Sequence, residues 1–158
     1  MNALLCWTLA AMVALSGVSR AQSAEKKDAG PGSAREKLVG AWRLASLGEP
    51  GADGKVHSLA GLTGTLLYTR DGHMSVQIMY PQSAGALTND YVLNGYEASF
   101  GSYDVNEAAH TVTHHVQGSI THGLVGKDLT RVYQFSDGQL IIKSARPDEH
   151  WSVTWEHY

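Results

Sequence analysis

Two adjacent histidines in a strand-like segment are the residues of this chain best suited to chemistry. His114 and His115 lie in the run 111–120, where side-chain character alternates as in a β-strand with one buried face. Successive side chains of a strand point to opposite faces, so one histidine would line the inside if the sheet closes into a barrel. The pattern favours His114, which shares its face with Val112 and Val116. An imidazole in an apolar interior orients a ligand or holds a proton.

Two further residues could act together with these histidines. Glu97 and Tyr103 share one face of the segment 91–105 and could meet His114 or His115 across a barrel. A carboxylate–imidazole or tyrosine–imidazole pair can move a proton to or from a ligand carbon. The candidate catalytic groups are therefore His114, His115, Glu97 and Tyr103. The alternative is that His114 is a core histidine bonded to a tyrosine or a carbonyl, and that Glu97 is exposed near the start of a strand.

Short strands must position these side chains. Asp71-Gly72 and Asp137-Gly138 are typical hairpin turns, and no segment shows a long helical period. A short helical turn over 33–38 is indicated by Ser33 as N-cap with Glu36 three residues later. The pattern predicts an all-β fold, an eight-stranded antiparallel up-and-down barrel. The expected strands are 39–47, 63–69, 73–80, 91–105, 111–120, 127–135, 139–145 and 151–157.

Length, composition and charge bound the function further. The chain has 158 residues, 43% of them hydrophobic, which fits one domain with one core. The net charge of −3 gives no reason to expect nucleic acid or an anionic membrane as a partner. The histidines and carboxylates are not spaced so that three must converge on one ion, so we expect no metal and no cofactor.

The first residues predict export. The run 3–18 is nearly all apolar or small, and Ser19-Arg20-Ala21 fits the pattern that signal peptidase cleaves. We expect a signal peptide over 1–21, a flexible linker over 22–37 and a barrel domain over 38–158, in a periplasmic or secreted protein. An uncleaved anchor and a cytosolic helix are the alternatives. Cys6, the only cysteine, lies within the signal, which excludes disulfides and cysteine catalysis in the mature protein.

Several motifs carry a family resemblance. The run 38–44, with Gly40 and Trp42, resembles the Gly-x-Trp start of lipocalin and calycin barrels. The run 64–75, GTLLYTRDGHMS, is similar to a stretch of the lipocalin-like domain family of bacteria and fungi, and 101–105 and 111–119 continue that pattern in order. The resemblance implies a small barrel with an internal cavity. It does not imply one activity, because such barrels carry lipids and pigments and some catalyse cyclisation or isomerisation.

The resemblance also suggests roles for single residues. Gly40 and Trp42 would be structural, with Trp42 closing one end of the barrel. In such barrels this tryptophan often stacks on an arginine of a late strand, and Arg131 is the candidate. If Arg131 instead points into the cavity, it would bind an anion such as a ligand carboxylate. Residues 120–126 stand where the family tends to have an Asn/Pro-rich loop, so the mouth is expected to differ.

Two functions remain open from the sequence. The favoured one is an exported protein that binds a small hydrophobic molecule in the barrel cavity. The alternative is a cofactor-free enzyme, a cyclase, isomerase or dehydratase, that uses the cavity His, Glu and Tyr side chains for proton transfer. After cleavage of the signal no membrane partner is expected, and the sequence gives no indication of oligomeric state. The residues expected to hold the ligand are His114, Tyr68, Tyr103, Arg131 and Tyr133.

Overall fold

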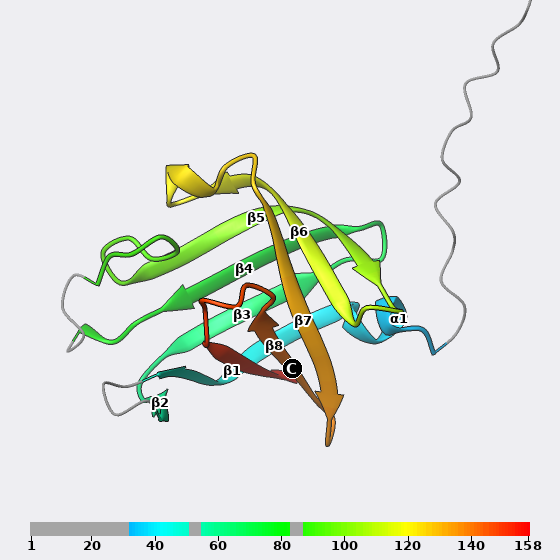
Figure 1. Cartoon of the computed structure of the whole chain (residues 1–158), viewed down its shortest axis with the longest axis horizontal. Coiled ribbons are helices and arrows are strands. Elements are labelled where there is room, and N and C mark those ends of the chain that lie inside the picture. Colours follow the sequence, from blue (N-terminus) through cyan, green and yellow to red (C-terminus); the bar gives the residue numbers. More distant parts are fainter. Residues whose placement is uncertain (1–31, 51–54, 83–86) are drawn as a thin grey trace, which may run out of the picture.

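The strands close on themselves because the first pairs with the last. The computed structural model describes residues 32–50, 55–82 and 87–158, so the expected signal peptide and most of the expected linker lie outside the described residues. The strands are β1 (Gly40–Pro50), β2 (Val56–Leu59), β3 (Thr63–Tyr68), β4 (His73–Met79), β5 (Tyr96–Asn106), β6 (Thr111–Ser119), β7 (Asp128–Ser136), β8 (Gln139–Ser144) and β9 (Ser152–His157). Figure 1 shows how they wrap around one interior.

Antiparallel pairing of neighbours builds the barrel. Strands β3 to β9 follow one another in chain order, and β1 pairs with both β3 and β9. The eight-stranded up-and-down barrel predicted from the sequence is therefore confirmed. The structure adds one strand, β2, which pairs with the end of β1 outside the closed ring. Its four residues are too few for an alternating pattern to stand out.

Turn chemistry and alternation explain why these strands form. Asp137 and Gly138 both have positive φ, 52° and 78°, as a two-residue type I′ hairpin turn requires. On β6 the inward positions Val112, His114 and Val116 are buried, as the alternating pattern predicted. The expected strand 91–105 begins later, at Tyr96, because 91–95 forms a turn held by the bond from the Tyr96 amide to the Leu93 carbonyl.

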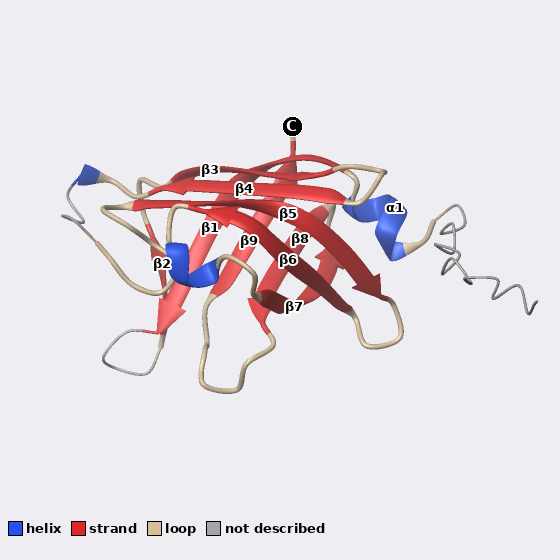
Figure 2. Cartoon of the chain, turned by 90° about the horizontal axis from the view of Figure 1, so that it is seen from above, coloured by secondary structure: helices blue, strands red, loops and turns tan. Residues whose placement is uncertain are grey.

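A short helix covers one end of the barrel. Helix α1 (Ala34–Leu38) begins after Ser33, whose Oγ accepts a hydrogen bond from the Glu36 amide at 3.1 Å, as the capping pattern predicted. Leu38 is fully buried, and its carbonyl accepts a bond of 2.8 Å from Nε1 of Trp42. Figure 2 shows α1 at this end, which we call the closed end. Among the described residues no helix is long and apolar enough to span a bilayer.

The prediction that Trp42 stacks on Arg131 was wrong. The Trp42 indole lies against the His157 ring, with centroids 3.6 Å apart, and Arg131 lies elsewhere. The reason is the pairing of β1 with β9, which sets Trp42 directly opposite His157. Gly40 belongs to the same arrangement, because a Cβ atom there would come within 2.7 Å of the His157 ring.

Candidate functional site

A narrow cavity lies inside the barrel toward the end opposite α1, which we call the mouth. The volume of the cavity is about 80 Å³. A single water molecule requires only ~10–15 Å³ of such volume. The cavity therefore has room for a small molecule, or for the end of a slender one. Most of its wall is apolar, from residues such as Leu47, Leu66, Val76, Ile142, Val153 and Trp155.

Arg131 is the cation of this cavity. It lies on β7, is only 6% exposed, and has its guanidinium 4.7 Å from the centre of the Trp151 ring and 5.2 Å from that of Tyr91. Among the described residues, Arg43, Arg70 and Arg146 make ion pairs with carboxylates, and Arg131 makes none. The aromatic faces compensate a buried cation only in part. Arg131 therefore retains its capacity to bind an anion.

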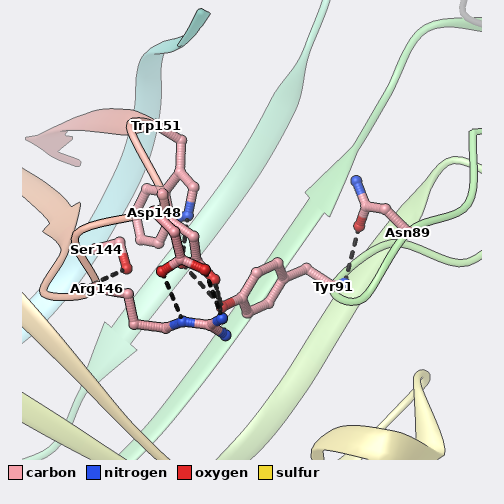
Figure 3. A network of polar contacts seen from close by, with 7 residues as sticks. Asn89, Tyr91, Ser144, Arg146, Asp148 and Trp151 are labelled. Atoms are coloured by element: carbon pink, nitrogen blue, oxygen red, sulfur yellow. Dashed lines mark hydrogen bonds and ion pairs between the residues drawn. The ribbon is translucent and has the colours of Figure 1, made fainter.

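A network at the mouth fixes the two aromatic rings that flank Arg131. The Tyr91 hydroxyl donates to Glu149 at 2.9 Å, and Nε1 of Trp151 donates to the same carboxylate at 3.1 Å. Arg146 pairs with Glu149 at 3.1 Å. Figure 3 shows Tyr91 and Arg146 meeting from two separate connections of the barrel. The network holds Tyr91 and Trp151 in place before any ligand arrives.

Glu97 brings a carboxyl group to the same cavity. It is the second residue of β5, and burial raises its pKa to about 7. The charge of Arg131 opposes this rise, and that of Glu49, another cavity residue, adds to it. Tyr80, just after β4, also lines the cavity, and burial raises its pKa with contributions from Glu97 and Glu49. Near neutral pH Glu97 is therefore present both with and without its proton.

His114 lies deeper in the cavity and is already bonded to the wall. Its Nε2 is 2.6 Å from the Tyr68 hydroxyl. Burial, followed by the charges of Arg131 and His115, lowers the pKa of His114 to about 3. Burial also raises the pKa of Tyr68. At neutral pH both rings are therefore uncharged and share one hydrogen bond, and His114 is a weak base.

The other residues expected at the site lie elsewhere. His115 points outward, with Nδ1 2.7 Å from Asp128 and Nε2 3.1 Å from Asp104. Tyr68 lies behind His114, and Tyr103 lies against Tyr68 with its hydroxyl donating to the Thr69 carbonyl at 2.9 Å. The structure thus brings together His114, Glu97 and Arg131 and leaves Tyr68, Tyr103 and Tyr133 outside the cavity lining.

Sequence reasoning did not single out five polar or aromatic lining residues as site residues: Glu49, Tyr80, Asn89, Tyr91 and Trp151. Tyr91 and Trp151 precede regular strands, and Glu49 and Tyr80 stand at or beyond strand ends, where alternation gives no direction. The available signal was that four aromatic or acidic residues stand beside strand ends at the same end of the barrel, which could have indicated a site at the mouth. Within the described ranges, no group of three or more His, Cys, Asp or Glu side chains could hold a metal ion.

Comparison with known proteins agrees with this geometry. Residues 39–157 match the sequence pattern of a lipocalin-like domain. The chain belongs to the lipocalin-like domain family. Comparison with curated proteins finds no match.

Solved structures similar to this lipocalin-like chain share little sequence identity with it. A lipocalin-like protein from Bacteroides uniformis is 13% identical over 77% of this chain and 99% of its own, with a TM-score of 0.47. A protein from Bacteroides eggerthii is 15% identical over 77% and 99%, with a TM-score of 0.45. The fluorescent protein UnaG is 14% identical over 78% and 98%, with a TM-score of 0.38.

Proposed function

We propose that this lipocalin-like protein binds a small hydrophobic molecule with an anionic group, and that Arg131 holds the anion. The observation that carries the proposal is the buried guanidinium in an apolar cavity, with no carboxylate partner among the described residues. A guanidinium presents paired N–H donors that fit a carboxylate, and such charge-assisted bonds are strong in a site with little water. The apolar wall below Arg131 would take the body of the ligand.

The protein would work outside the cytoplasm. The apolar run 3–18 followed by Ser19-Arg20-Ala21 supports export, to the periplasm or the medium. N-terminal sequencing of the protein recovered from each compartment of its host tests this part of the proposal. A mature chain that begins at Gln22 supports it, and an intact Met1 in the cytoplasmic fraction contradicts it.

Binding can be tested with two ligands that share a body and differ in charge. We expect 3-phenylpropionate to bind by calorimetry and Arg131→Gln to weaken it by about tenfold or more, a loss of ~1.4 kcal/mol or more. The same substitution should reduce the affinity for the neutral 3-phenylpropan-1-ol much less. Arg43→Gln is the matched control, since Arg43 is an exposed arginine paired with Glu156 at 2.6 Å. Equal affinity of wild type and Arg131→Gln for the anion would refute the proposal.

The second candidate function is proton transfer by Glu97. A buried carboxyl group with a pKa of about 7 suits a general base at neutral pH, whereas His114, with a pKa of about 3, does not. The ligand retained by protein purified from its host, identified by native mass spectrometry, separates the two functions. An enzyme would convert that molecule, or exchange one of its C–H hydrogens in D₂O, and Glu97→Gln would abolish the reaction. A binding protein would release it unchanged.

A further inference from the structure

The cavity of this barrel has an acidic side as well as a basic one. Glu49 lies on β1, Tyr80 just after β4 and Glu97 on β5, in the half of the wall that β1, β3, β4 and β5 form. Arg131 comes from the other half, β6 to β9. All four line one cavity near the mouth. A ligand that enters with an anionic head for Arg131 therefore brings that head close to carboxyl groups.

Arg131 and Glu97 influence each other without touching. The charge of Arg131 opposes the effect of burial on the pKa of Glu97, yet the two make no ion pair among the described residues. Arg131 is instead held between Tyr91 and Trp151, whose shared bond partner Glu149 keeps them in place. Because both groups line the same cavity, a ligand head bound there can contact both of them.

A simple carboxylate bound to Arg131 is repelled once Glu97 has lost its proton. When Glu97 is ionised, a bare carboxylate on Arg131 faces a second negative charge, and Glu49 adds to the repulsion. A head that also carries an N–H donor would turn the same carboxyl group into a partner. His114 also lines the cavity, but it is neutral near pH 7 because its pKa is about 3, so it adds no charge.

Resting on the proposed function, we propose that the ligand is a zwitterionic or amide-type amphiphile, whose head presents an anionic group to Arg131 and an N–H donor to Glu97. Its chemical class is that of an α-amino acid with an apolar side chain or a derivative that keeps the N–H. The apolar side chain would extend toward Leu66, Val76 and Trp155. Glu97 is then the residue that selects the head, and Arg131 the residue that anchors it.

The test uses two probes that differ by one amino group, phenylalanine and 3-phenylpropionate. Both keep their carboxylate ionised between pH 6 and pH 8, and phenylalanine keeps its ammonium. Since Glu97 ionises over this range, phenylalanine should bind more tightly at pH 8 than at pH 6, and 3-phenylpropionate more weakly. We expect a change of about fivefold to tenfold in the ratio of the two affinities.

The variant Glu97→Gln identifies the group responsible. It should abolish most of the pH dependence of both affinities. At pH 8 it should weaken the binding of phenylalanine and strengthen that of 3-phenylpropionate. Glu156→Gln, which changes a carboxylate paired with Arg43 on the outer face, is the matched control and should leave both affinities unchanged. Circular dichroism and the unfolding midpoint confirm that each variant is folded.

The outcomes separate this inference from the proposed function. If 3-phenylpropionate binds in an Arg131-dependent manner but phenylalanine binds no better at pH 8 than at pH 6, the inference is overturned and the proposed function stands. A pH dependence that persists in Glu97→Gln would likewise overturn the inference alone. If neither probe depends on Arg131, both are overturned.

Discussion

The hydroxyl of Tyr68 on β3 lies 2.6 Å from Nε2 of His114 on β6, so a hydrogen bond joins two strands across the barrel interior. Two strands, β4 and β5, separate them in the sheet. The imidazole and the phenol are both uncharged at pH 7, so the tautomer of His114 sets which of the two groups donates. This bond satisfies the polar atom of His114 that would otherwise face the apolar wall.

Removing the Tyr68 hydroxyl should destabilise the protein. We expect Tyr68→Phe to lower the free energy of unfolding by about 1–3 kcal/mol, because Nε2 of His114 loses its buried partner. Urea unfolding at pH 7 measures the change. An unchanged midpoint would mean that the bond does not contribute to stability.

Replacing Tyr133 by Phe should leave the stability of the protein unchanged or increase it, in contrast to Tyr68→Phe. The Tyr133 hydroxyl is buried and, among the described residues, has no hydrogen-bond partner. Tyr133→Phe removes this unsatisfied group while keeping the ring contacts with His110 and Phe135. We expect the free energy of unfolding to stay constant or rise by up to about 1 kcal/mol. A loss as large as that of Tyr68→Phe would show that Tyr133 has a partner in solution.

The loss of stability at acid pH should depend on His114. Its pKa is about 3 in the folded protein and 6.5 without the effects of burial and neighbouring charge, so the unfolded chain binds a proton more readily between these values. Stability therefore falls as pH drops from about 6.5 toward 3. His114→Gln, whose side-chain amide does not titrate and can still hydrogen-bond with Tyr68, should reduce this pH dependence in urea unfolding between pH 4 and pH 7.

His115 provides the matched control for that titration. Bonds to Asp128 and Asp104 raise its pKa, so its contribution to stability is present at low pH and is lost as pH rises through the folded value. His115→Gln should therefore lower stability mainly in acid and leave the His114-dependent slope in place. A reduced pH dependence in His115→Gln, with that of His114→Gln unchanged, would contradict the assignment.

Gly40 should tolerate no side chain. Its φ is +145°, a region that other residues rarely adopt, and a Cβ atom would lie 2.7 Å from Cε1 of His157. We expect Gly40→Ala to lower the unfolding free energy by about 2 kcal/mol. Adding His157→Ala should restore part of the loss, because it removes the clash and leaves the backbone strain. Full stability in Gly40→Ala would show that the backbone adjusts freely.

Local patterns were enough to predict most of the fold. Alternation along 111–120 placed His114 inside and His115 outside, and Asp137-Gly138 marked a hairpin that the structure forms with two left-handed residues. The capping pattern at Ser33 predicted α1. Each of these signals depends on a few consecutive residues, because side-chain direction in a strand and backbone φ in a turn are local properties. β2 escaped prediction since four residues carry no period.

The partners of Arg131 were decided by the tertiary structure. Alternation showed that Arg131 shares a face with Leu129 and Tyr133, but the residues above its guanidinium, Tyr91 and Trp151, come from segments 40 and 20 positions away. The expected partner Trp42 was taken instead by His157 when β1 paired with β9. By itself the sequence determined which faces turn inward. Which inward side chains meet depended on the register of strands that touch only once the barrel has closed, and no local pattern encodes that register.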